Sequence, residues 1–429
     1  MHSRRDPIPE GARAATASAE AKMTRNFWVW LHRWAGLAMA GFLVIVGLTG
    51  SLLAFWLELN HWLTPEMYPG ERPGIALDAA TLAHRAEAIV PGARTTTVYL
   101  GYPGSVMIGM EPREGAAPLD FDYIHLDPID GRERGRASWS GLPKAKNDIM
   151  PFVYALHMHL AISGVGDWIL GVVALVWTLD CFVGFYLTFP TPTDRARKGF
   201  LARWRPAWLV KWRGSAYRVN FDLHRACGLW LWAMLLIFAW SSVYMDLNSV
   251  YTRVTQLVLD YEKPIRGHGD HGRPAPSGRE PMSWEEAQAT GESLMAAEAG
   301  KRGLTIERVL ALYLSRGLGG WEYRVRSSAD IGDRYGSTSV YFDAFDGQLA
   351  GVKIPTGERS GMTVTTWLIQ LHTANLFSMP YKVFVCILGL VIAILSGTGV
   401  YIWSRKRRAR RRHAAEAAVP GALAQESLR

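Results

Sequence analysis

The sequence predicts an α-helical membrane protein with four transmembrane helices in two tandem repeats, each repeat carrying an external α+β module. Three observations predict this fold class. Four apolar runs are each about 20 residues long, which is enough for a helix to cross the hydrocarbon of a bilayer. Histidine-containing motifs beside these runs occur twice in the same order. The 429 residues are 49% hydrophobic and only 20% charged, with 18 Trp, a more apolar composition than a soluble domain has.

The four apolar runs are residues 35–57, 168–189, 226–245 and 383–403. Asp180 is the single charged residue in them. Because a soluble helix is rarely apolar on every side over such a length, we expect each run to span the membrane. The first run is too long for the apolar core of a cleaved signal peptide, so we expect it to remain as a span. The three cysteines lie far apart in apolar segments and predict neither a disulfide nor a thiolate metal site.

Basic residues gather on one side of the predicted spans. They precede the first span, recur between the second and third, and follow the fourth as Arg405-Lys406-Arg407-Arg408. By the positive-inside rule, both termini and the short middle segment lie in the cytoplasm. This placement accounts for the net charge of +9, so we expect a lipid bilayer and no nucleic acid as partner. The expected order is a cytoplasmic segment (1–26), the first span (27–59), an external module (60–149), the second span with a lead-in helix (150–189), a cytoplasmic loop (190–220), the third span (221–247), a second external module (248–362), the fourth span with a lead-in helix (363–404) and a basic cytoplasmic tail (405–429).

The chain repeats itself. The Leu-His-Arg sequence at 31–33 recurs at 223–225, an offset of 192, and the Leu-His sequence at 156–157 recurs at 371–372, an offset of 215. Each half therefore has the order span, external module, span. Because the two halves have the same topology, we expect a pseudo-twofold axis along the membrane normal to relate them.

The external segments read as small α+β modules. The first has a helical pattern at 77–90, strand-like stretches at 95–99 and 106–110, and a turn at 127–131. The second has a helix at 284–300, strands at 321–325 and 337–342, and a turn at 346–347. The stretch 266–278 is rich in Gly, Pro and His and reads as a loop, although its His268 and His271 are also candidate metal ligands.

Four histidines carry the predicted chemistry. His32 and His224 lie at the cytoplasmic ends of the first and third spans, and His157 and His372 lie at the outer approaches to the second and fourth. One histidine at a helix end needs no explanation, but the same residue in register twice in each half indicates a function. Residues on opposite membrane faces are about 30 Å apart and cannot share one metal ion. The repeat therefore predicts that His32 faces His224, and that His157 faces His372.

Two imidazoles are a good axial ligand set for haem iron. Zinc would require further ligands that no nearby Cys or carboxylate supplies. The chain has no Cys-x-x-Cys-His motif for covalent attachment. The sequence therefore predicts two non-covalent b haems per chain, bound at the two histidine pairs.

Several neighbouring residues have more than one interpretation. Arg33 and Arg225 follow the cytoplasmic histidines and are either contacts for haem propionates or basic flanks of the spans. Gly36 and Gly228 give room for a macrocycle or allow close helix packing. Asp180 is a proton site, a neighbour of a propionate or an interhelical hydrogen-bonding residue.

Two further histidines are alternative ligands. His61 and His159 lie on the outer side without repeat counterparts, and His159 is able to replace His157 in the outer pair.

The histidine motifs and the Asp-x-x-x-Gly turns resemble the PepSY-associated transmembrane family of bacterial inner-membrane proteins. The matching motifs are Leu31-His-Arg-Trp-Ala-Gly-Leu, Leu223-His-Arg-Ala-Cys-Gly-Leu, Leu156-His, Leu371-His-Thr, and the turns Asp127 to Gly131 and Asp343 to Gly347. The resemblance implies periplasmic PepSY-like modules and a haem-bearing reductase that delivers electrons to ferric siderophores in the periplasm, releasing Fe(II) for iron uptake. One departure is that Leu48-Thr49-Gly50 in the first span corresponds to Trp240-Ser241-Ser242 in the third, which weakens the symmetry of helix packing.

The electron donor is not encoded in the chain. A flavin or nicotinamide domain needs a βαβ unit, and the middle loop is too short to contain one. We therefore expect a separate cytoplasmic reductase or membrane quinol as the donor. Two other classes of protein stay open: a haemless ligand-binding or regulatory membrane protein of PepSY type, and a transporter.

Overall fold

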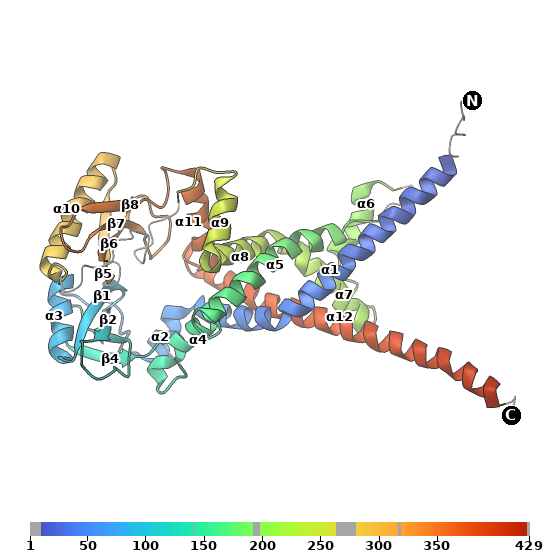
Figure 1. The fold of residues 1–429 in the computed structure, drawn as a ribbon, viewed down its shortest axis with the longest axis horizontal. Helices are drawn as coiled ribbons and strands as arrows, with labels where there is room; N and C mark the ends of the chain where they lie inside the picture. The colour runs from blue at the N-terminus through green and yellow to red at the C-terminus, as the bar shows by residue number, and fades with distance from the viewer. Residues whose placement is uncertain (1–9, 140, 192–197, 263–279, 316–318, 427–429) are drawn as a thin grey trace. The chain divides into compact units, whose positions relative to one another are not determined.

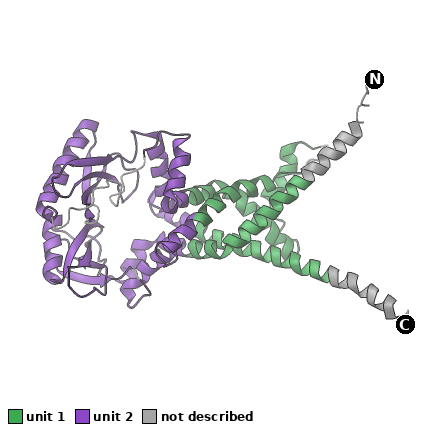
Figure 2. Ribbon diagram, in the orientation of Figure 1, with its two compact units in different colours: residues 1–48, 172–240, 388–429 green, residues 49–171, 241–387 purple. Residues whose placement is uncertain are grey.

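The computed structural model describes residues 10–139, 141–191, 198–262, 280–315 and 319–426. The chain forms two compact units, each assembled from segments far apart in the sequence (Figure 2). Unit 1 comprises residues 1–48, 172–240 and 388–429, and unit 2 comprises residues 49–171 and 241–387. The loop expected at 266–278, with His268 and His271, lies outside the described residues.

Apolar helices form most of unit 1, and some of them continue into unit 2. Their bounds are α1 Glu10–Leu53, α5 Val165–Leu187, α6 Phe200–Trp204, η2 Arg205–Trp208, α7 Ala216–Trp230, α8 Trp232–Asp246 and α12 Ser378–Glu426. Among the described residues, Met23–Leu53, Val165–Leu187 and Ser378–Arg412 are long and apolar enough to cross a membrane. The protein is therefore a multi-pass membrane protein.

The third expected span differs from the prediction of one continuous helix. It consists of α7 and α8, which meet at Leu231 with a bend of 69° and make a fourth candidate span only when taken together. The first expected span also ends early, because α1 stops at Leu53 and a separate helix, α2 Trp56–Leu63, follows it. The tail expected after residue 404 continues α12 as a helix.

An eight-stranded antiparallel sheet dominates unit 2 (Figure 1). Its strands are β1 Ala93–Tyr102, β2 Ser105–Pro112, β3 Tyr123–Leu126, β4 Glu133–Ala137, β5 Ile306–Ser315, β6 Gly320–Ser327, β7 Thr338–Asp343 and β8 Leu349–Lys353. The strand order is β4-β3-β2-β1-β5-β6-β7-β8, so the same four-stranded meander occurs twice, in mirrored order from the centre. The sequence predicted two external modules and gave no prediction of contact between them. Antiparallel pairing of β1 with β5, centred on Val98 and Leu312, joins them into one sheet.

Two helices, α3 Ala79–Ile89 and α10 Trp284–Arg302, cover one face of this sheet (Figure 1). The Asp78 side chain caps α3 by accepting from the Thr81 N–H, and Ser283 caps α10 together with Glu286 in a capping box. Alternate residues of both meanders point toward the helices and form one continuous apolar core. The core includes Ile108, Ile124, Leu312, Trp321 and Phe342.

The two predicted turns have the same hydrogen bonds. The Asp127 carboxylate accepts from the N–H groups of Ile129 and Asp130, at 2.8 and 3.2 Å. The Asp343 carboxylate accepts from the two corresponding N–H groups at the same distances. Each turn ends on a glycine in the left-handed region, Gly131 with φ +71° and Gly347 with φ +72°, which side chains rarely adopt. The sequence repeat is thus a structural repeat.

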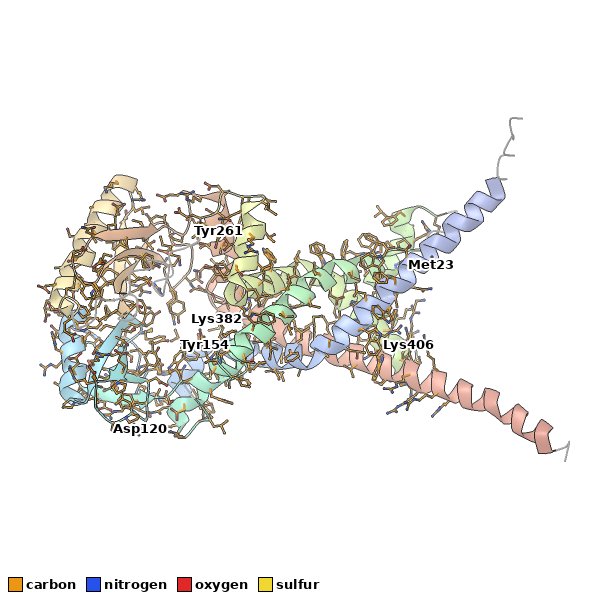
Figure 3. The ribbon with its side chains drawn as sticks, viewed as in Figure 1. Met23, Asp120, Tyr154, Tyr261, Lys382 and Lys406 are labelled. Atoms are coloured by element: carbon orange, nitrogen blue, oxygen red, sulfur yellow. The ribbon has the colours of Figure 1, made fainter. Side chains whose placement is uncertain are left out.

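The remaining described helices of unit 2 are α2 and four others: η1 Lys146–Asp148, α4 Ile149–His159, α9 Asn248–Gln256 and α11 Ser360–His372. Tyr154 on α4 makes ring contacts with Trp56 of α2 and with Trp139, and Lys382 donates to Glu58 of α2 at 2.6 Å (Figure 3). These contacts hold α2, α4 and the start of α12 together. His157 and His372 lie near the C-terminal ends of α4 and α11.

Candidate functional site

The structure brings His32 and His224 together within unit 1; we call them pair A. His32 lies on α1 and His224 on α7, and their ring centroids are 6.2 Å apart with an angle of 63° between the ring planes. Both side chains are half-buried. This is the pairing that the sequence repeat predicts.

Each ring of pair A is oriented through its Nδ1 atom. His32 Nδ1 lies 2.9 and 3.0 Å from the two carboxylate oxygens of Asp180 on α5. His224 Nδ1 lies 3.1 Å from the carbonyl oxygen of Leu395 and 3.0 Å from Thr398 Oγ1, both on α12. A carbonyl accepts hydrogen bonds and does not donate them, and a carboxylate does the same when it is ionised, so Nδ1 is the nitrogen that would carry the proton in each neutral ring. Nε2 is then the nitrogen whose lone pair would bind a metal.

The repeat explains the partners on α5 and α12. Asp180 and Leu395 are counterparts at the offset of 215. Asp180 contacts His32 through its side chain, and Leu395 contacts His224 through its backbone carbonyl. Gly184 and Gly399 are counterparts as well. A Cβ atom at either glycine would lie 3.5 Å from the Cε1 atom of the neighbouring ring, an ordinary van der Waals contact.

His157 and His372 meet within unit 2; we call them pair B. Their ring centroids are 6.3 Å apart and their planes are inclined by 74°. Hydroxyl groups contact both Nδ1 atoms: Thr49 Oγ1 on α1 at 3.0 Å from His157, and Ser241 Oγ on α8 at 2.6 Å from His372. Pair B thus has nearly the same ring spacing as pair A with different partners.

Sequence reasoning missed the roles of Thr49 and Ser241. The two residues are counterparts at the offset of 192, the same offset that relates the two Leu-His-Arg motifs. A hydroxyl-bearing residue at this position in both halves was the available signal. The prediction assigned the surrounding sequence to helix packing alone.

The geometry of both pairs fits a metal held between two imidazoles. A metal–imidazole nitrogen bond is about 2 Å long, so rings on opposite sides of one ion have centroids about 6 Å apart. Gly36 and Gly228 each follow a histidine of pair A by one helical turn, and a Cβ atom at either would have no neighbour within 4 Å. No atom of the described residues thus occupies the space directly beside these two backbone positions, as a macrocycle bound at pair A would require. Within the described ranges, no cluster of three or more His, Cys, Asp or Glu is placed to hold a bare metal ion.

Comparison with known families matches residues 29–406 to the family described as PepSY-associated TM region. The chain belongs to this family. The match includes all four histidines and confirms the resemblance noted in the sequence. A search of curated proteins gave no match.

The two alternative histidines of this PepSY-associated protein, His61 and His159, are not members of the ring pairs. His61 is exposed, and its Nδ1 atom lies 2.6 Å from the carbonyl oxygen of Tyr68. His159 follows His157 by two residues, about 200° around the helix, and it is His157 whose ring contacts that of His372.

The two predicted arginines lie beside pair A along the chain. Arg225 donates to Asp222 at 2.9 Å and to the carbonyl oxygen of Pro206 at 2.7 Å. Arg33 is half-buried on α1 directly after His32. All three cysteines are unpaired, as expected.

Proposed function

We propose that this protein is a di-haem b electron carrier of the bacterial inner membrane, with both termini in the cytoplasm. Pair A would bind one haem near the cytoplasmic face, and pair B would bind the other near the periplasmic face. Electrons would pass outward to an Fe(III)–siderophore in the periplasm, which releases Fe(II) for uptake. The observation that carries the proposal is the occurrence of two histidine pairs with centroids 6.2 and 6.3 Å apart, all four rings engaged through Nδ1.

The protein's own residues hold and orient the group, while haem supplies the one-electron chemistry when bound. Partners at Nδ1 fix which nitrogen binds iron and how the ring is turned, as second-shell groups do at other metal sites. Arg33 and Arg225 are the proposed contacts for the propionates of the haem at pair A. Arg225 is already held by Asp222, so it would offer an N–H group from a fixed position.

The substrate side of the proposal rests on unit 2. Pair B and the eight-stranded sheet belong to the same compact unit, so the proposed outer haem and the proposed docking surface for a ferric chelate would be carried by one unit. Electrons would enter from a separate cytoplasmic reductase or from quinol. The loop at 190–220 is too short for a nucleotide-binding βαβ unit.

A visible spectrum of the purified protein tests the proposal first. We expect a reducible low-spin haem spectrum and two haems per chain. Reduced protein should then reoxidise on addition of a ferric siderophore, and an Fe(II) chelator should capture the released iron. The gallium(III) complex of the same siderophore is the control, since gallium(III) accepts no electron under these conditions.

Three outcomes would contradict parts of the proposal. A chain without haem would favour the ligand-binding, regulatory or transporter alternatives. One haem per fully loaded chain would contradict the two-site assignment. Reoxidation by another acceptor, with every ferric chelate inert, would leave an electron carrier and remove the siderophore.

A further inference from the structure

The four histidines differ in the charge of the group at Nδ1. Asp180 presents a carboxylate to His32 at 2.9 Å. The groups recorded at the other three Nδ1 atoms are neutral: a carbonyl and a hydroxyl at His224, and one hydroxyl each at His157 and His372. Pair A thus contains a carboxylate–imidazole contact, whereas the Nδ1 contacts described for pair B are with hydroxyl groups.

The Asp180 contact is built into the packing of the helices. Asp180 is the single charged residue in its apolar run, and its side chain is only 10% exposed. Both carboxylate oxygens lie within 3.0 Å of His32 Nδ1, across the interface between α5 and α1. A carboxylate is costly to place among apolar helices, so a specific interaction must offset that cost.

The repeat shows that the fold does not require this carboxylate. Leu395 occupies the corresponding position on α12 and orients His224 with its backbone carbonyl. Ring orientation is therefore achieved in the second half without a charge. What Asp180 adds beyond orientation is negative charge and a stronger hydrogen-bond acceptor.

Both additions act on a metal in the same direction. An imidazole whose Nδ1–H donates to a carboxylate becomes a more basic ligand at Nε2, which stabilises the oxidised metal. A nearby negative charge in a medium of low dielectric constant also stabilises the more positive oxidation state. Iron bound by His32 would therefore have a lower reduction potential than iron bound by histidines with neutral partners.

We propose that Asp180 is a positioning residue that sets the reduction potential of pair A below that of pair B. The inference rests on the proposed function, because it requires haem at both pairs. One electron passed from pair A to pair B oxidises the first iron from Fe(II) to Fe(III) and reduces the second from Fe(III) to Fe(II). The donor then restores the first. Asp180 makes this outward transfer downhill, so a carboxylate that only one half of the repeat carries at this position sets the direction of electron transfer.

Potentiometric titration of the purified di-haem protein, followed by its visible spectrum, tests the inference without any turnover measurement. We expect two midpoints, the lower from pair A. Asp180→Asn keeps the size of the side chain and removes its charge. It should raise the lower midpoint by at least the equivalent of a tenfold change in the reduction equilibrium, which is about 59 mV for a one-electron couple. The higher midpoint should not move.

Two matched variants separate tuning from structural damage. Asp180→Glu retains a carboxylate and should keep the lower midpoint nearer to that of the native protein than Asp180→Asn does. Asp167→Asn removes a carboxylate from the same helix, one that accepts from the Gly164 N–H at 2.6 Å, and should move neither midpoint. If Asp180→Asn fails to retain haem, the lower midpoints of Asp180→Ser and Asp180→Glu are compared instead. The inference requires a higher value in Asp180→Ser, which has no carboxylate, than in Asp180→Glu, which keeps one.

The assignment of each midpoint uses single-site proteins. His157→Ala leaves pair A alone, and its one midpoint should match the lower native value. A chain that binds no haem would overturn both the proposed function and this inference. A di-haem chain in which Asp180→Asn leaves the lower midpoint in place, or moves the higher one, would overturn the inference alone.

Discussion

Pairs A and B have nearly the same ring spacing and differ in what orients the rings. In pair A the ring partners include a carboxylate and a backbone carbonyl, groups that favour a proton on Nδ1. In pair B the partners are hydroxyls, which accept or donate. The repeat relates the two rings within each pair, whereas pairs A and B are not repeat counterparts and differ in the charge of the groups at Nδ1. Similar geometry with different surroundings is the arrangement that two sites of different potential require.

The largest expected effect separates the two pairs completely. His32→Ala or His224→Ala should remove the haem at pair A and leave that at pair B, because a lone imidazole holds a low-spin haem poorly. His157→Ala or His372→Ala should do the reverse. The measurement is the haem content per chain with the visible and paramagnetic resonance spectra of each variant.

His159→Ala is the control, since it removes a neighbouring histidine on the same helix and should leave both haems. Loss of one haem in His159→Ala, with His157→Ala unaffected, would transfer the outer ligand assignment to His159. Loss of both haems from any single variant would show that the sites are not independent.

A second effect is the pH dependence of the stability of the sheet in unit 2. His125 on β3 is 1% exposed, with its Nδ1 atom 3.0 Å from Ser105 Oγ, and burial lowers its pKa to about 3. The unfolded chain, with a histidine pKa of about 6.5, takes up a proton that the folded sheet does not. The stabilisation from neutral His125 is therefore complete above about pH 6.5 and is lost as pH falls toward 3.

Between pH 7 and pH 5 this loss is about 2 kcal/mol in the free energy of unfolding of the sheet. Hydrogen exchange of the β2 and β3 amides, corrected for intrinsic rates, measures it. His125→Gln replaces the ring with a side chain that does not titrate and should flatten the dependence. An equally steep dependence in His125→Gln would place its origin elsewhere in unit 2.

The sequence predicted the parts of the molecule that the repeat determines. It predicted the ring pairs that the structure shows, because the repeat leaves one counterpart for each histidine. It also located the Asp127 and Asp343 turns, since Asp and Gly at fixed spacing encode that hydrogen bonding locally.

Contacts made by backbone atoms, and the pairing between the edge strands of the two meanders, could not be predicted from the sequence. Leu395 orients His224 through its carbonyl, which no residue type reveals. The joining of β1 to β5 was missed because a repeat specifies the pairing inside each copy and not which edges meet. The break at Leu231 was missed because the apolar run around it contains no proline to mark it.

The smallest expected effect concerns the hydroxyls of pair B. Thr49→Val is nearly isosteric and removes the hydroxyl 3.0 Å from His157 Nδ1, and Ser241→Ala removes the one 2.6 Å from His372 Nδ1. Loss of a neutral hydrogen bond at a partly buried ring costs about 1 kcal/mol, so haem should dissociate from pair B roughly fivefold faster in each variant. Transfer of haem to an excess of a scavenging protein measures the rate.

Thr398→Val is the matched control at pair A. It also removes a hydroxyl, 3.0 Å from His224 Nδ1, but the Leu395 carbonyl still accepts from that ring, so the rate should change less than twofold. Because Thr49 and Ser241 contact different rings, the costs should add in the double variant. If Thr398→Val accelerates haem loss as much as Thr49→Val does, the carbonyl does not substitute for the hydroxyl, and the contrast between the two pairs reduces to the charge of Asp180.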